Sequence, residues 1–251
     1  MPITNPESGT RIDEIADGIY RISTPVPPSP ALPPGFTFNQ ILIVDDDSLL
    51  FHTGPRRMFP LVRQALASVL PPERLRWVAF SHVEGDECGS LAEWLAVAPS
   101  AAPVCSRVAA MVYTEDATDR PARALADGDK LSLGRHSVQW FDAPHVPHGW
   151  DCGFLGETTT RTLLCGDLFT QGGAELPPVT ESEILGPSEG MRHAIDYFAH
   201  SPATGQTLER LAAFEPRLLA CMHGSSYRGD GAAHLRGLAK SLDLEMASRP
   251  H

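Results

Sequence analysis

Four apolar, strand-like runs in this chain each end in a loop that carries side chains able to bind metal ions. The loops are SHVEGDECG (81–89), APHVPHGWD (143–151), LLCGDLF (163–169) and CMHGSS (221–226). Buried strands that end in Asp or His commonly present those side chains into a shared cleft. The chain must therefore fold so that four strand ends, far apart in the sequence, meet at one place.

The order of the predicted elements indicates an α/β fold with two sheets. Alternating or continuous apolar runs predict strands, and apolar spacings of three and four predict helices. Strands are expected within 17–24, 38–55, 73–80, 103–106, 127–144, 152–167 and 217–224, and helices at 58–71, 89–97, 107–116, 188–200, 204–214 and 231–246. This order predicts an αββα sandwich, in which two packed mixed β-sheets are flanked by helices. No linker divides the chain, so we expect a single domain over 1–251.

The segment TPVPPSPALPPG (24–35) interrupts this pattern with six prolines. Proline lacks a backbone N–H and fixes φ, so the segment is expected to be neither a helix nor a central strand. A stiff, polyproline-like surface connection is one interpretation. A flap over a functional site is the other.

Composition narrows the class of protein. The formal net charge of −11 argues against a partner that is nucleic acid or an anionic membrane surface. No window approaches 18 consecutive apolar residues, and the first residues lack the pattern of a signal peptide. The five cysteines are odd in number and form no CxxC pair, which favours reduced thiols in a cytoplasmic protein.

The ligand residues fit a pair of divalent cations. Such a pair lies about 3.5–4 Å apart and needs several anionic ligands, one of which bridges the ions. We expect Asp167 to bridge with its two oxygens. One ion is then completed by His82, Glu84 and His148, and the other is held by Asp86 and His223. Glycines beside the ligands are expected to let the loops turn tightly.

Three further residues leave alternatives open. His145 is expected to be a supporting residue, or a ligand if its loop shifts. Glu87 follows Asp86 directly and either binds the second ion or leaves that place to solvent. His52 is expected to be a strand-end histidine with a backbone partner.

The HxExD loop, the acidic turn in LIVDDDSLLFHTGP, the GD after a strand and the final HG appear together in the order of the metallo-β-lactamase fold superfamily. The chain resembles that superfamily from about residue 15 to 230. Its hydrolytic members carry HxHxDH at the first loop, whereas this chain has Glu84 in place of the second His and Glu87 in place of the last. The Glu84 replacement resembles the metal domain of flavodiiron proteins and the related oxygen-binding di-iron proteins. HGWD (148–151) resembles the HWPD stretch of that group, which favours His148 over His145 as a ligand.

The resemblance implies two iron ions held by His82, Glu84, Asp86, His148, Asp167 and His223. Three carboxylates and three imidazoles make a harder site than the imidazole-rich sites of zinc hydrolases, and harder ligands suit iron. Flavodiiron proteins carry a flavodoxin domain after the metal domain, and we expect none within this chain. A flavin or rubredoxin-type electron donor is therefore expected in trans. The resemblance also implies a head-to-tail homodimer.

Two functions remain open at this point. In the first, a non-haem di-iron protein binds dioxygen, or nitric oxide in the same way, and acts as a reductase or an oxygen sensor. In the second, two zinc ions lower the pKa of a bridging water to about 7, and the resulting hydroxide attacks an ester, lactone or phosphodiester. Metal content separates the two functions.

Overall fold

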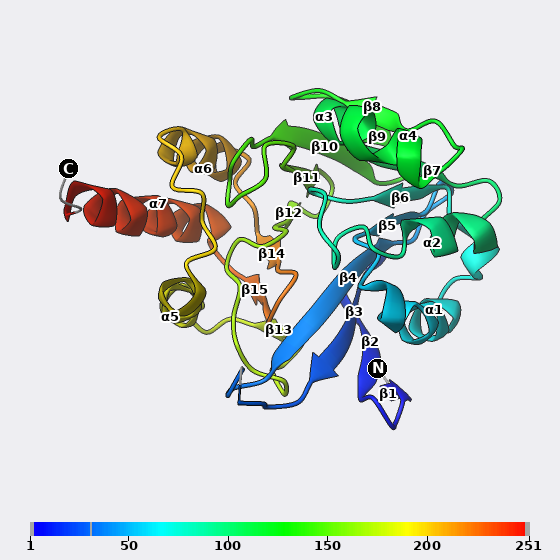
Figure 1. The fold of residues 1–251 in the computed structure, drawn as a ribbon, viewed down its shortest axis with the longest axis horizontal. Coiled ribbons are helices and arrows are strands. Elements are labelled where there is room, and N and C mark those ends of the chain that lie inside the picture. The colour runs from blue at the N-terminus through cyan, green and yellow to red at the C-terminus, as the bar shows by residue number, and fades with distance from the viewer. Residues whose placement is uncertain (1–2, 31, 249–251) are drawn as a thin grey trace.

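A computed structural model of the protein describes residues 3–30 and 32–248. Two β-sheets pack face to face in the centre, and helices cover both outer faces (Figure 1). The helices α1 to α4 lie on one side of the sandwich, and α5, α6 and α7 lie on the other. The predicted αββα architecture is confirmed.

The first sheet has eight strands within the described residues, in the order of the chain. They are β1 (Ile3–Asn5), β2 (Thr10–Ala16), β3 (Ile19–Val26), β4 (Phe36–Ile43), β5 (Leu49–Phe51), β6 (Trp77–Ala79), β7 (Ala102–Ser106) and β8 (Arg123–Leu125). Strands β1 to β5 pair antiparallel, and β5 to β8 pair parallel, so the sheet is mixed.

The second sheet has seven strands in the described part of the chain, in the order β13-β15-β14-β12-β11-β10-β9. They are β9 (Lys130–Ser132), β10 (Ser137–Asp142), β11 (Gly153–Glu157), β12 (Thr162–Leu164), β13 (Val179–Thr180), β14 (Leu218–Ala220) and β15 (Ser226–Arg228). The helices are α1 (Phe59–Ala67), α2 (Leu91–Val97), α3 (Arg107–Ala109), α4 (Glu115–Ala117), α5 (Leu185–Ile195), α6 (Thr204–Ala213) and α7 (Gly231–Ser248), and a π-helical turn over Ala110–Thr114 joins α3 to α4.

The alternation of side chains along the strands produces three apolar layers. Ile41 and Ile43 of β4 face the second sheet and pack in one cluster with Trp140, whereas Leu42 between them packs with the residues of α1 and α2. In β12, Leu164 joins the layer between the sheets and Leu163 joins the layer under α6 and α7. Successive residues of a strand point to opposite faces, so apolar residues on both faces require cover on both sides.

The proline-rich segment differs from the prediction at its start. Strand β3 continues to Val26, and Pro25 pairs with Thr37 of β4. The pairing of β3 with β2 ends at Ser23. Pro25 therefore has no β2 residue beside it, and its missing N–H breaks no hydrogen bond between these two strands. The segment therefore forms the end of a β3–β4 hairpin, and β4 carries two aromatic residues of the functional site.

All five cysteines are buried and none is in a disulfide, as predicted. Among the described residues, no helix has both the length and the apolar run that crossing a bilayer requires.

Candidate metal centre

The six predicted ligands come from both sheets and lie together at one end of the sandwich. His82, Glu84 and Asp86 lie in the loop that follows β6 of the first sheet. The second sheet contributes His148 from the β10–β11 loop, Asp167 after β12 and His223 after β14. The six side chains and Glu87 form two groups of potential metal ligands.

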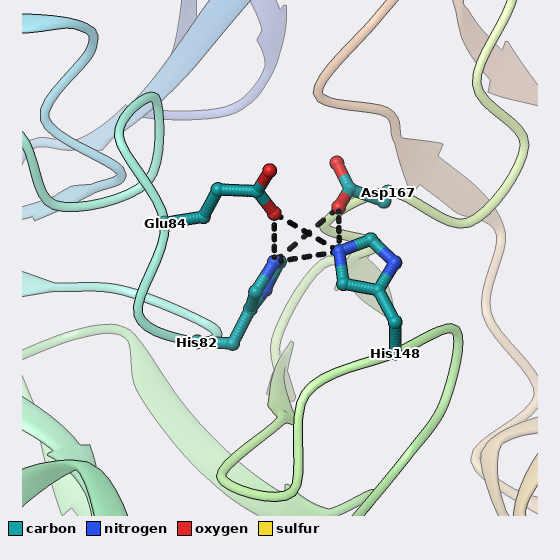
Figure 2. Close-up of side chains that lie close together, drawn as sticks. All are labelled: His82, Glu84, His148 and Asp167. Atoms are coloured by element: carbon teal, nitrogen blue, oxygen red, sulfur yellow. Dashed lines mark hydrogen bonds and ion pairs between the residues drawn. The ribbon is translucent and has the colours of Figure 1, made fainter. Parts of the chain in front are cut away.

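The first group contains His82, Glu84, His148 and Asp167, whose ligand atoms all lie within 4.8 Å of one another. His148 Nε2 lies 3.0 Å from Glu84 Oε2 and 3.3 Å from Asp167 Oδ2. His82 Nε2 lies 3.1 Å from Glu84 Oε2 and 3.5 Å from Asp167 Oδ2. Figure 2 shows both imidazoles and both carboxylates directed toward a common point.

The second group contains Asp86, Glu87 and His223. His223 Nε2 lies 3.4 Å from Asp86 Oδ2 and 3.3 Å from Asp167 Oδ1. Asp167 thus turns one oxygen toward each group. This is the arrangement that a bridging carboxylate requires.

Each of the three imidazoles is oriented through its other nitrogen. His148 Nδ1 donates to the carbonyl oxygen of Tyr197, and His223 Nδ1 donates to the carbonyl oxygen of Thr37, both at 2.8 Å. His82 Nδ1 lies 2.9 Å from the Ser81 hydroxyl. A partner at Nδ1 fixes the ring and leaves Nε2 for a metal, so all three Nε2 atoms face the centre.

The hydrogen bonds around His82 extend to His52, which the sequence analysis did not connect with the site. The Ser81 hydroxyl also lies 2.9 Å from His52 Nε2, so the His52 ring contacts a side chain where a backbone partner was expected. His52 is buried, has a φ of 67° and stacks on Phe51. Burial lowers the pKa of His52 to about 3. When His82 donates from Nδ1 to the Ser81 oxygen, the Ser81 hydroxyl can donate its own proton to the Nε2 atom of neutral His52.

Buried side chains of the first sheet hold the His223 loop in place. Asn39 Nδ2 donates to the carbonyl oxygens of Cys221 and Gly224, each at 3.0 Å. Arg21 donates to the same Gly224 oxygen at 2.7 Å. These bonds cross from one sheet to the other, so the packing of the sandwich sets the position of His223.

The carboxylates and imidazoles at the centre shift one another's pKa values toward the charged forms. Burial opposes ionisation of Asp167, but the hydrogen bond from His223 and the charges of the other imidazoles outweigh it and lower the pKa of Asp167. Hydrogen bonds from His148 and His82 lower the pKa of Glu84 to about 2. Burial alone would lower the pKa of His223, yet hydrogen bonds to Asp167 and Asp86 raise it to about 9.

His145 and Glu87, which the sequence left open as possible ligands, differ in where they lie. His145 is exposed, its N–H donates to Gly149 in the loop, and it belongs to neither ligand group. Glu87 belongs to the second group and is completely buried. Burial, followed by the charges of Asp167 and Asp86, raises the pKa of the Glu87 carboxyl well above its ordinary value.

A largely apolar cavity of about 720 Å³ opens onto both ligand groups. Phe36, Phe38, Ile195 and Tyr197 line it together with Arg56 and Arg57. The ring of Phe36 stacks on His223 at 4.2 Å between centroids, and Phe38 meets it edge-on. The cavity gives an apolar ligand access to the centre.

The donor atoms fit metal ions. Ligands of one ion with bonds of about 2.0–2.2 Å lie about 2.8–3.6 Å apart at tetrahedral or octahedral angles. The separations between nitrogen and oxygen in the first group run from 3.0 to 3.5 Å. The Nε2 atoms of His82 and His148 face one another at 3.1 Å, although His148 already donates through Nδ1. Both nitrogens are therefore placed to bind one metal ion.

We expect the metal-free protein to lose stability as the pH rises from 6.5 to 9. The folded pKa of His223 is raised from 6.5 to about 9, and that of His148 is also raised. A group whose pKa is higher in the folded than in the unfolded protein stabilises the fold at pH values below its unfolded pKa. This contribution is lost as the pH rises through its folded pKa. Thermal unfolding of chelator-treated protein at pH 6.5 and pH 9 measures the loss. The His223→Gln variant should show a smaller fall in unfolding temperature between the two pH values. Equal unfolding temperatures of the unmodified chain at pH 6.5 and pH 9 would contradict the expectation.

The sequence profile described as ODP family beta lactamase matches residues 36–224. The chain belongs to this family. The matched residues include every member of the two ligand groups. The predicted resemblance to a metallo-β-lactamase-fold di-iron domain is confirmed at the level of the family and the fold.

The ODP-family chain is similar to larger proteins. It is 25% identical over 208 residues to the rubredoxin-oxygen oxidoreductase of Megalodesulfovibrio gigas, which covers 78% of this chain and 50% of the relative. The chain spans half or less of the length of the first curated relatives that it matches, from 24% to 50%.

Solved structures share the fold. The rubredoxin oxygen:oxidoreductase of Desulfovibrio gigas superposes with a TM-score of 0.81 at 21% identity, covering 96% of this chain and 63% of that one. The metal-soaked Flv1 flavodiiron core from Synechocystis sp. PCC6803 superposes with a TM-score of 0.80 at 21% identity, covering 95% of this chain and 62% of the other.

Proposed function

We propose that this ODP-family chain is a non-haem di-iron protein that binds dioxygen, or nitric oxide in the same way. It reduces the bound molecule when a separate flavin or rubredoxin-type donor supplies electrons. The observation that carries the proposal is the shared carboxylate: Asp167 directs one oxygen to each of two ligand groups. The similarity to a protein named for rubredoxin and oxygen supports the substrate and the donor.

The ligand set supports iron as the metal. Glu84 lies 3.1 Å from His82 and 3.0 Å from His148, at the place where zinc hydrolases of this fold have an imidazole. Carboxylates are harder ligands than imidazoles and favour iron in its higher oxidation state. When bound, a pair of ferrous ions supplies two electrons to dioxygen.

The residues around the ligands support binding of a small apolar molecule. Phe36, Phe38 and Ile195 give the cavity apolar walls, which suit a small apolar molecule such as dioxygen. The tethers of His148 and His223 to backbone carbonyls keep the rings fixed when the charge at the centre changes. The proposed homodimer and the sensor role stay predictions.

Metal content and an optical spectrum test the proposal. Protein purified without added metal should hold about two iron ions per chain, and anaerobically reduced protein should develop a near-ultraviolet to visible band on exposure to air. Zinc at about two ions per chain, no such band and turnover of a chromogenic ester would overturn the proposal in favour of the hydrolase.

The Glu84→His variant should retain less iron and take up more zinc. The new imidazole makes the first ligand group softer and removes one negative charge beside His82 and His148. Competitive loading with equal iron and zinc, followed by elemental analysis, measures the change. Glu115→His is a matched control because Glu115 is exposed and lies outside both groups. Unchanged iron occupancy in Glu84→His would show that ligand hardness does not decide the metal.

A further inference from the structure

Glu87 is a buried carboxylate without a hydrogen-bond donor. Its side chain is completely buried, and neither carboxylate oxygen has a hydrogen-bond partner among the described residues. The groups that act on it electrostatically are Asp167, Asp86 and Glu84, all of them carboxylates. Burying an unpaired carboxylate is costly, so buried carboxylates are normally paired or bind metal. Something must compensate Glu87 in the working protein.

The geometry points to the second metal position. One oxygen of Glu87 lies within 4.8 Å of ligand atoms of both Asp86 and His223. His223 Nε2 in turn lies 3.3 Å from Asp167 Oδ1, the oxygen that faces this group. The backbone holds Glu87 there, since its carbonyl accepts the Thr53 N–H at 2.8 Å.

We propose that Glu87 is a direct ligand of the second metal ion, which then has three carboxylates and one imidazole. The proposal rests on the proposed function, because it presupposes two ions. It makes the centre unequal: the first ion has two imidazoles from His82 and His148, and the second has only His223. Since carboxylate oxygens are the harder ligands, the second position should discriminate more strongly against soft metals.

Glu87 also changes the charge balance. Glu84, Asp86, Glu87 and Asp167 together carry four negative charges when ionised, which equals the charge of two ferrous ions. With three carboxylates, a hydroxide is needed for neutrality. The fourth carboxylate removes that need, and the position between the ions is then open to a neutral ligand such as dioxygen.

A rival arrangement leaves Glu87 protonated, with its proton shared with Asp86. The Glu87→Gln variant separates the two, because a glutamine amide donates to Asp86 as a protonated carboxyl does but binds metal weakly. Anaerobic titration of the metal-free full chain with ferrous iron, followed by elemental analysis, gives the stoichiometry and both affinities. Glu115→Gln serves as the control for an exposed position.

We expect unmodified protein and the control to bind about two ions, and Glu87→Gln to bind the second about 100-fold more weakly with the first unchanged. The melting temperature of metal-free Glu87→Gln should not fall, because the amide keeps the shape of the side chain and brings no charge into the buried position. Equal affinities for both ions in Glu87→Gln would overturn the ligand assignment alone. Fewer than two ions in unmodified protein would instead overturn the proposed function.

A crystal structure of the iron-loaded unmodified chain tests the assignment without any variant. A Glu87 oxygen about 2.0–2.2 Å from the second ion is expected. A separation beyond about 3 Å would exclude a bond and overturn the proposal.

Discussion

The Asp167→Asn variant should lose both metal ions, whereas loss of any other ligand should weaken one. Asp167 alone among the described ligands faces both groups, with Oδ2 at 3.3 Å from His148 and Oδ1 at 3.3 Å from His223. An asparagine keeps the shape but offers one neutral oxygen, so it cannot bridge. We expect the affinity for each ion to fall about 100-fold or more.

Iron content after dialysis against a weak chelator measures this loss. Asp116→Asn is the matched control, since Asp116 is exposed and belongs to neither ligand group. Circular dichroism should show that Asp167→Asn remains folded, because the three apolar layers do not depend on the carboxylate. Retention of one tightly bound ion would show that Asp167 serves a single position and does not bridge.

Replacing Gly89 by alanine should abolish binding of the second ion, and replacing Gly85 should not. A Cβ at Gly89 would lie well inside contact distance of the Gly85 carbonyl oxygen, which is backbone and cannot rotate away. A Cβ at Gly85 would meet nothing within 4 Å. The loop between these glycines carries Asp86 and Glu87, so relief of the clash must displace ligands.

The pair of glycine variants provides its own control, because both substitutions add one methyl group to the same loop. Overpacking of this kind costs about 1–3 kcal/mol, so Gly89→Ala should also unfold at a lower temperature. Iron stoichiometry and thermal unfolding measure the two effects. Equal iron binding by Gly89→Ala and Gly85→Ala would show that the close approach of Gly89 to the Gly85 carbonyl does not hold the ligands in place.

The sequence allowed us to predict which side chains lie together at the candidate site, because the signals are local. Strand β12 is followed within three residues by Asp167, and β14 is followed within three residues by His223. The apolar runs identify the strands, and the polar residue at each end identifies the ligand. Helix α1 was predicted at 58–71 and observed at Phe59–Ala67, because its apolar spacing faces the first sheet.

Features that depend on pairing between distant segments could not be predicted in this way. The link from His52 to Ser81 follows from the parallel pairing of β5 with β6, in which Phe51 lies opposite Ala79. Strand β13 has only two residues and is defined by its pairing with β15. A contact between two strands and a strand of two residues leave no apolar periodicity in the sequence. Pattern and propensity could therefore not predict either one.

The division of the ligands between the sheets also sets the order of maturation. Three of the six predicted ligands follow β6 in the first sheet, and the other three belong to loops of the second. A ribosome-bound chain that ends before His223 offers at most an incomplete pair of sites. Binding of both ions at the proposed centre must therefore wait until the chain has been synthesised beyond His223 and the two sheets have packed together.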